Sequence, residues 1–234
     1  MPNLAEINVI DDNIVWNKQI LKSLKCNNNS WPNFINLMTK EFDFSSHRQI
    51  NQYYRKFKKI PKLQPNKLYI KELAPLLKKR LVAVNFRQSN LSNYPNNPHR
   101  DSDNQNWFRF FKYAQTEYKN ILFILLGEIN RYARSIISLE NVLSLRGLNY
   151  HLGHEMSLIL SEVPFIGTSS GFGAIATFSN SPYVILNFEH ISSKYVEVKI
   201  GQNYPFASSN QKIIWEYDNY DKIINSFKSL INND

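Results

Sequence analysis

The sequence predicts an α/β fold, a Rossmann-like doubly wound parallel sheet with a mainly helical N-terminal extension. From Arg80 onward, short runs of β-branched and aliphatic residues alternate with segments of about ten residues at helical spacing. Such alternation implies right-handed βαβ crossovers and a parallel sheet covered on both faces. Residues 1–79 contain helical spacing but no clear strand. We therefore divide the chain into an extension, 1–79, and a Rossmann-like domain, 80–234.

Three segments of the extension have apolar residues at helical spacing, and prolines interrupt the residues that follow the third. These segments are 13–25, 30–42 and 47–60, and the last ends before Pro61. The stretch 62–79 contains two further prolines and is interpreted as broken by them.

In the predicted domain, strands and helices follow one another in a regular order. The expected strands are 80–88, 121–127, 141–145, 164–168, 182–187 and 212–217. The expected helices are 107–118 (capped by Asp101, Ser102 or Asp103), 131–138, 153–163, 170–180 and 219–231.

Composition excludes several classes of protein. No apolar run approaches the roughly 20 residues that span a bilayer. The N-terminus carries acids where a signal peptide would carry Lys or Arg. Cys26 is the only cysteine, so neither an intrachain disulfide nor a cysteine zinc cluster can form. We expect a cytoplasmic protein that uses no metal or other cofactor.

The net charge of +9 is concentrated in one segment. Between His47 and Arg80, eleven Lys and Arg residues stand against one acid, Glu72, and four aromatic residues interleave with them: Tyr53, Tyr54, Phe57 and Tyr69. Segment 48–80 could lie on an anionic membrane or bind nucleic acid. It could also be a charged helical surface whose aromatic residues pack on the domain. We rank the membrane above nucleic acid, and expect peripheral attachment to the inner face of the membrane.

The most informative stretch is 164–187. Its strand ends near Gly167, and the turn Thr168-Ser169-Ser170-Gly171 leads directly into a helix. In parallel sheets, ligands bind beyond the carboxyl ends of the strands, and glycine lets a ligand approach the backbone. The turn predicts a phosphate or sugar site. The alternative is a tight turn in which serine caps the helix.

The segment FIGTSSGFGAIATFSNSPYVILN resembles the signature of the C-terminal domain of GT-B-fold glycosyltransferases, including heptosyltransferase-like and capsule or O-antigen enzymes. Segments 151–163 and 212–231 are similar to the flanking elements of those enzymes, so the resemblance covers roughly 80–232. It implies a domain that binds a nucleotide-activated sugar for cell-envelope polysaccharide synthesis, with metal-independent displacement at the anomeric carbon. Ser169 stands where the family often has Asp, so no carboxylate is carried over.

Two arginines are candidates for the donor diphosphate. Arg87 ends the first expected strand, and Arg100 lies in the loop that follows. Guanidinium groups form forked, charged hydrogen bonds with phosphates. The alternative is that Arg87 only forms an ion pair with Asp101 or Asp103.

Three further residues are candidates for contacts with the sugar or ribose: Glu155, Glu189 and His190. Glu155 could instead complement a helix N-terminus, and the other two could have a simple loop role. His151, His154 and Glu155 do not form a His-Glu-x-x-His motif, so no metal site is predicted.

The 79 residues before Arg80 are too few for the N-terminal domain of a complete GT-B enzyme. We therefore expect the C-terminal part of a glycosyltransferase, completed by a homodimer or by a separate N-terminal half. The catalytic base is not identified, and the available candidates are Asp11, Asp12, Glu41 and His47. Three alternatives remain open: a non-catalytic sugar-nucleotide-binding module, a GT-B-type sugar-nucleotide epimerase and a basic nucleic-acid-binding protein.

Overall fold

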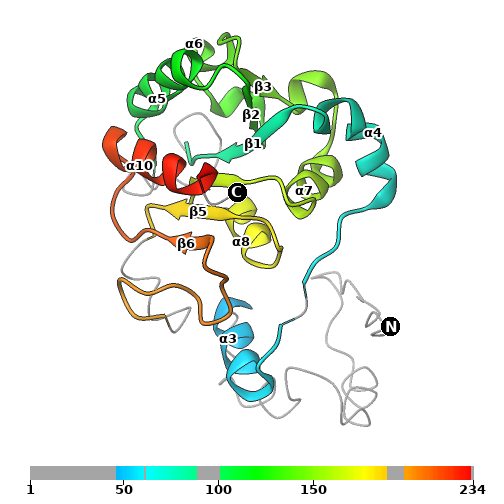
Figure 1. Cartoon of the computed structure of the whole chain (residues 1–234), viewed down its shortest axis with the longest axis vertical. Coiled ribbons are helices and arrows are strands. Elements are labelled where there is room, and N and C mark those ends of the chain that lie inside the picture. The colour runs from blue at the N-terminus through cyan, green and yellow to red at the C-terminus, as the bar shows by residue number, and fades with distance from the viewer. Residues whose placement is uncertain (1–45, 61, 89–100, 189–197, 233–234) are drawn as a thin grey trace, which may run out of the picture.

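A computed structural model describes residues 46–60, 62–88, 101–188 and 198–232 (Figure 1). The helices predicted at 13–25 and 30–42 lie outside these ranges. Within them, strands and helices alternate along the chain as the sequence predicts.

The core of the molecule is a six-stranded sheet in which every neighbouring pair is parallel. The strand order is β3-β2-β1-β4-β5-β6. The strands are β1 (Arg80–Asn85), β2 (Ile121–Leu125), β3 (Val142–Ser144), β4 (Phe165–Thr168), β5 (Tyr183–Leu186) and β6 (Gln211–Ile213). This arrangement confirms the predicted Rossmann-like α/β class.

Seven α-helices and two 3-10 helices connect or flank the strands in the described ranges. The α-helices, numbered as in Figure 1, are α3 (Ser46–Phe57), α4 (Lys67–Leu77), α5 (Asn104–Glu117), α6 (Arg134–Ile137), α7 (Leu152–Leu160), α8 (Gly171–Thr177) and α10 (Tyr220–Ile231). The 3-10 helices are η2 (Ile129–Arg131) and η3 (Arg146–Leu148). None of the helices in the described part is long and apolar enough to cross a membrane.

Both faces of the sheet are covered, because side chains alternate along each strand. In β1, Val82 and Val84 join one buried cluster, whereas Leu81 and Ala83 join the other. The first cluster is covered by α5, α6 and α10, and the second by α4, α7 and α8 (Figure 1). Burial on both faces explains why these strands read as continuous apolar runs in the sequence.

The direction of winding reverses at β1. The chain passes from β1 to β2 and β3 on one side, and then returns across the sheet to β4, β5 and β6 on the other. Since crossovers are right-handed, strands added in opposite directions place their connecting helices on opposite faces. Helix α5, which follows β1, and helix α8, which follows β4, therefore diverge at the carboxyl end of the sheet. Ligands of doubly wound sheets bind at this kind of switch point.

Helix α4 differs from the predicted proline-broken segment, because Pro75 lies within it. Proline removes one backbone hydrogen bond, and contacts with the domain offset this loss. Leu73 is fully buried in the cluster shared with α7 and α8. The Glu72 carboxylate pairs with Nε2 of His154 at 2.5 Å. Helix α4 thus packs on the sheet domain, and the boundary at residues 79 and 80 stays a prediction.

Two leucines on α4 offer a test of this packing. We expect Leu73→Ala to lower the free energy of unfolding by about 2–5 kcal/mol, because it leaves a cavity in the core. Leu68→Ala is the matched control, since Leu68 is 59% exposed, and its effect should stay within about 0.5 kcal/mol. Urea unfolding measures both. Equally small effects would show that α4 contributes nothing to the stability of the sheet.

Candidate functional site

The ends of β1 and β4 meet at the switch point. The backbone N–H of Arg87 donates to Oγ1 of Thr168 at 2.9 Å, which joins the two strand ends. A Cβ on Gly167 would lie 2.1 Å from the carbonyl oxygen of Asn85, so only glycine permits this close approach of the strands. The structure therefore brings Arg87 and the predicted turn, 168–171, to one place.

Within the turn, two hydroxyl groups have a structural partner. Thr168 is buried and accepts the hydrogen bond from Arg87. Ser170 caps α8, because its Oγ accepts from the N–H of Gly173 at 3.2 Å. This is the serine cap that the sequence left open as an alternative. A hydroxyl that accepts still has a proton to donate, so the ligand role of the turn stays a prediction.

Ser169 and Gly171 are the open part of the turn. Ser169 is half-buried, and Gly171 is exposed. A Cβ built on Gly171 meets no atom within 4 Å. The space above this backbone is therefore accessible from outside, and a larger side chain could occupy it without displacing the fold.

Arg87 lies beside Asp101, with Nε and Oδ1 3.5 Å apart, so the ion pair that the sequence offered as an alternative is present. The Arg87 side chain is 28% exposed. Backbone contacts close the base of the same loop, because the N–H of Ser102 donates to the carbonyl of Arg87 at 2.9 Å. The Gln88 amide also donates to the carbonyl of Ser102. The two flanks of residues 89–100 are thus joined next to the switch point.

A buried carboxylate, Asp218, lies beside Ser102 and Trp107, which follow this loop in the chain. Its Oδ2 accepts from Nε1 of Trp107 at 2.8 Å, and Trp107 stacks on Phe86 after β1. Burial raises the pKa of Asp218, and hydrogen bonds from Ser102 and Trp107 partly oppose that shift. Asp218 thus joins the segment after β6 to Trp107 in the first turn of α5. The stacking of Trp107 on Phe86 extends this connection to the end of β1.

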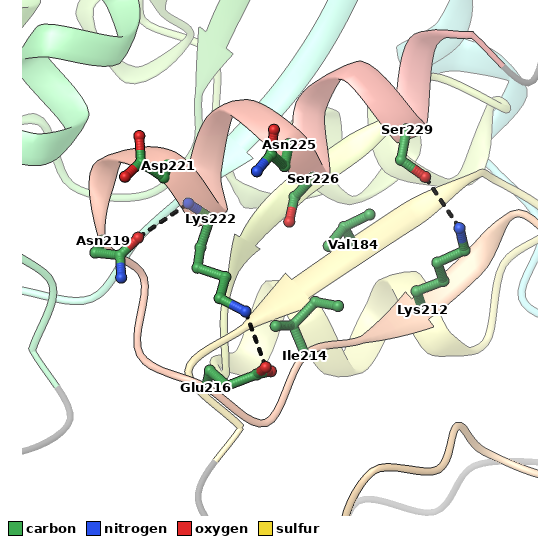
Figure 2. Close-up of a pocket in the computed structure, with 10 residues that line it drawn as sticks. All are labelled: Val184, Lys212, Ile214, Glu216, Asn219, Asp221, Lys222, Asn225, Ser226 and Ser229. Carbon is green, nitrogen blue, oxygen red and sulfur yellow. Dashed lines mark hydrogen bonds and ion pairs between the residues drawn. The ribbon is translucent and has the colours of Figure 1, made fainter.

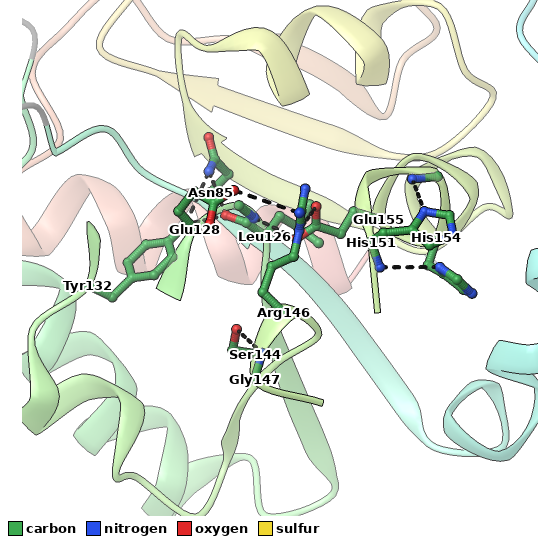
Figure 3. A network of polar contacts seen from close by, with 12 residues as sticks. Asn85, Leu126, Glu128, Tyr132, Ser144, Arg146, Gly147, His151, His154 and Glu155 are labelled. Carbon is green, nitrogen blue, oxygen red and sulfur yellow. Dashed lines mark hydrogen bonds and ion pairs between the residues drawn. The ribbon is translucent and has the colours of Figure 1, made fainter. Parts of the chain in front are cut away.

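Glu155 lies at the same edge of the sheet and is fully buried (Figure 3). Its Oε1 accepts from the backbone N–H of Gly127 at 2.7 Å, and its Oε2 accepts from Nε of Arg146 at 2.9 Å. Both oxygens of this candidate for sugar contact are therefore engaged by the protein. Removal of Arg146 would leave a buried charge without its partner, which costs about 3–5 kcal/mol.

The backbone after β2 is fixed by a second set of contacts in Figure 3. The carbonyl of Leu126 accepts from Nδ2 of Asn85 at 2.9 Å and from the Tyr132 hydroxyl at 2.5 Å. Burial raises the pKa of Tyr132, which keeps the hydroxyl protonated as a donor. Sequence reasoning missed these residues. The available signals were the polar Asn85 at the end of an apolar strand and the sequence Gly127-Glu128 soon after the neighbouring strand, β2.

Several predicted site residues lie outside the described ranges. They are Arg100, Glu189, His190 and the candidate bases Asp11, Asp12 and Glu41. His47 belongs to α3, but its side chain is not among those described.

A separate pocket of about 480 Å³ lies between the outer strands and α10 (Figure 2). Two lysines cross it: Lys212 donates to Ser229, and Lys222 pairs with Glu216, each at 2.9 Å. Val184 and Ile214 lie between these two contacts. Because both cations already join β6 and its extension to α10, the pocket is part of the packing of that helix.

The basic segment 48–80 does not form one continuous patch. Helix α3 contacts the loop before β6, where Tyr54 lies 6.0 Å from Phe206 between ring centroids. Lys62 donates to the carbonyl of Ser179, and burial lowers its pKa. Residues 78–80 lie instead at the start of β1, beside Lys119 at a crevice of about 900 Å³. Helix α3 and strand β1 lie in different parts of the fold (Figure 1), so the cations at the two ends of the segment are separated.

No family model matches the chain, and no curated protein sequence matches it. The likeness to glycosyltransferases stays a prediction.

Asp218 makes the stability of the fold depend on pH. Its folded pKa lies above its ordinary value of 3.8, so the folded state binds the proton more tightly than the unfolded chain. Stability is therefore lost as the pH rises from about 4 through the raised value. We expect Asp218→Asn to become more stable relative to the natural protein across that window, because Asn keeps an acceptor for Trp107.

Urea unfolding at a series of pH values from about 3.5 to 8 tests this prediction. The control is Asp218→Ala, which leaves the Trp107 N–H without its acceptor, so its free energy of unfolding should lie about 1–3 kcal/mol below that of Asp218→Asn at every pH. A natural protein that gains stability over Asp218→Asn with rising pH would contradict the sign.

Proposed function

We propose that this chain binds a nucleotide-activated sugar at the switch point, where the ends of β1 and β4 meet, as the donor-binding part of a glycosyltransferase. The observation that supports the proposal most is the strand order, because doubly wound sheets bind ligands where the order reverses, which here is at β1. The turn at 168–171 and Arg87 meet at that point. The sequence resemblance supports the sugar nucleotide over other phosphate ligands.

In this proposal, the donor diphosphate lies over the open part of the turn. Gly171 leaves space for close approach, and Ser169 adjoins it with a hydroxyl that can donate. The Arg87 guanidinium supplies positive charge, and its ion pair with Asp101 holds it at the switch point. Groups that are oriented before the reaction stabilise the charge that develops on a departing diphosphate. Cell-envelope polysaccharide synthesis is the process that the resemblance favours.

We also propose that the chain acts with a second domain. Transfer between two bound sugars requires a closed cleft that orients the acceptor and excludes water. The described residues form one Rossmann-like unit, and a second unit, from a second copy or from a separate N-terminal half, would complete the cleft. The acceptor and the catalytic base would then lie partly on that second unit.

Arg87 offers the first test of the binding site. We expect Arg87→Ala to weaken binding of UDP, GDP or ADP by roughly tenfold or more, because a hydrogen bond to a charged group contributes about 1.5–3 kcal/mol. Binding of the matching nucleoside, which has no phosphate, should change little. Isothermal titration calorimetry measures both, and Arg109→Ala is the control, since Arg109 is exposed and its guanidinium lies over the ring of Tyr220 at the start of α10.

Gly171→Val is a second variant at the same site, which fills the space over the turn without steric conflict in the fold. It should also weaken binding of the diphosphate. If a folded Gly171→Val protein binds as well as the natural protein, and Arg87→Ala loses nucleoside and diphosphate equally, the diphosphate site is elsewhere.

We further propose that α3 and the residues after it attach the protein to anionic membranes. Four cations are exposed there: Arg55, Lys56, Lys58 and Lys59. Phe57 is exposed beside them. Each such cation contributes about 1 kcal/mol of attraction near an anionic bilayer.

Co-sedimentation with phosphatidylserine vesicles tests the attachment. We expect binding at low salt that falls at high salt, because the attraction is screened within a Debye length of about 8 Å at physiological salt. Substitution of Lys56, Lys58 and Lys59 by Glu should abolish it, whereas Lys112→Glu on α5 should not. Tighter binding to single-stranded nucleic acid than to vesicles at the same salt would favour nucleic acid as the partner.

A further inference from the structure

A crevice of about 900 Å³ lies at the edge of the sheet where the strands begin, opposite the switch point. Its walls come from helix α5 and from the segments that enter β1, β2 and β3, and most of its lining residues are polar. Its volume lies in the range of small-molecule sites, about 300–1,000 Å³. Neither Arg87 nor the turn at 168–171 lines it. The amino-edge crevice is therefore separate from the proposed nucleotide site.

Four cations line the amino-edge crevice, against one acid, Glu140. Three of them, Lys78, Lys79 and Lys119, are exposed and form no ion pair with any described residue. The fourth, Arg80, is held in place because its Nη2 donates to the carbonyl of the final residue of α10 at 3.1 Å. Clefts lined by charges of one sign focus the electric field and attract ions of the opposite sign. The crevice therefore favours a ligand with more than one negative charge.

A buried hydrogen-bond acceptor also lines the crevice. Asn141 is 9% exposed, and its Oδ1 has no hydrogen-bond partner among the described residues. Its Nδ2 donates to the carbonyl of Phe111 at 3.0 Å, which fixes which end of the amide is the oxygen. Buried polar atoms almost always have a partner. Because cations line the crevice, the donor that fits beside them is a neutral hydroxyl and not an ammonium group.

The lysines and the acceptor enter the crevice from different strands. Strand β2 lies between β1 and β3 (Figure 1), and Lys79 and Asn141 come shortly before β1 and β3. Their backbones are therefore two strand spacings apart, about 10 Å. A lone phosphate ion is too small to contact both groups, whereas a sugar that carries a phosphate is long enough.

We propose that the amino-edge crevice binds a phosphorylated polyol, such as a sugar phosphate. The phosphate lies among the three exposed lysines, and one hydroxyl donates to Oδ1 of Asn141. Glu140, the residue before Asn141, accepts from Gln115 at 3.4 Å. This contact is long for a hydrogen bond and joins two flexible side chains, so it opens to admit the hydroxyl. The inference does not depend on the proposed function, because the two sites share no residue.

Isothermal titration calorimetry with glucose 6-phosphate tests the site. Lys78→Gln/Lys79→Gln should weaken binding by about tenfold or more, as the loss of hydrogen bonds between charged groups allows. The matched control, Lys58→Gln/Lys59→Gln, removes the same charge from two adjacent exposed lysines after α3 and should bind normally. Arg87→Ala should bind normally too. Equal losses in the control, or a loss confined to Arg87→Ala, would overturn the proposal.

The hydroxyl contact is tested from both sides. Asn141→Ala should weaken binding of glucose 6-phosphate by about threefold to tenfold, the range of a neutral hydrogen bond, and leave binding of inorganic phosphate unchanged. The natural protein should bind ethyl phosphate, which has no hydroxyl on its carbon chain, more weakly than glucose 6-phosphate by a similar factor. Equal affinity for these two ligands would overturn the hydroxyl contact even if Asn141→Ala fails to fold.

Vesicles distinguish two sources of a phosphorylated polyol, a free sugar phosphate and the headgroup of a phosphoinositide lipid. If the headgroup is the ligand, vesicles that contain phosphatidylinositol 4-phosphate should bind more tightly than phosphatidylserine vesicles of equal charge. Lys78→Gln/Lys79→Gln should remove that preference. The absence of any preference assigns the crevice to the soluble ligand. A natural protein that shows neither this preference nor binding of glucose 6-phosphate would overturn the proposal and leave the nucleotide site untouched.

Discussion

Strand β1 pairs with β2 on one side and with β4 on the other, and the chain winds away from it in both directions. The rest of the structure depends on this reversal. Right-handed connections place α5 and α8 on opposite faces, so the two helices diverge at this edge of the sheet. The residues that meet there come from loops distant in sequence, such as Arg87 and Thr168. Their proximity is a result of topology, not of any local motif.

The buried Glu155 has a comparable influence on a smaller scale. A carboxylate is expensive to remove from water unless charged and polar partners replace the lost hydration. Here Arg146 and the Gly127 N–H supply those partners. The same contacts remove freedom from the loops after β2 and β3, so the groups they carry are ordered before any ligand arrives. A site that is ordered in advance loses less entropy on binding.

Much of the fold could be predicted from the sequence because it depends on local patterns. The apolar runs at 164–168 and 182–187 correspond to β4 and β5, since strands buried on both faces must be apolar throughout. Asp103, one of three predicted caps, is the residue that caps α5. The prediction that Pro75 breaks the segment 62–79 is wrong, because Pro75 lies inside α4. Buried contacts of Leu73 offset the backbone hydrogen bond that proline removes, and a local sequence pattern does not reveal such contacts.

The candidate site could be predicted only in part, for the same reason. The turn at 168–171 is contiguous and therefore visible in the sequence. The partners of Glu155 are 28 and 9 residues away, and no spacing rule links them. Full burial of Glu155 could not be foreseen either, because acidic residues in the first turn of a helix are ordinarily exposed there.

The loop that leaves β1 has its two flanks joined by the Ser102–Arg87 and Gln88–Ser102 hydrogen bonds. The distance from the sheet to α5 is therefore independent of how many residues lie between them. Closing a longer loop costs little, about 0.6 kcal/mol for each doubling of its length. Natural variation or engineering could thus lengthen, shorten or replace this loop while the sheet and its aromatic core keep their geometry. The scaffold and the loop between β1 and α5 can therefore evolve as separate modules.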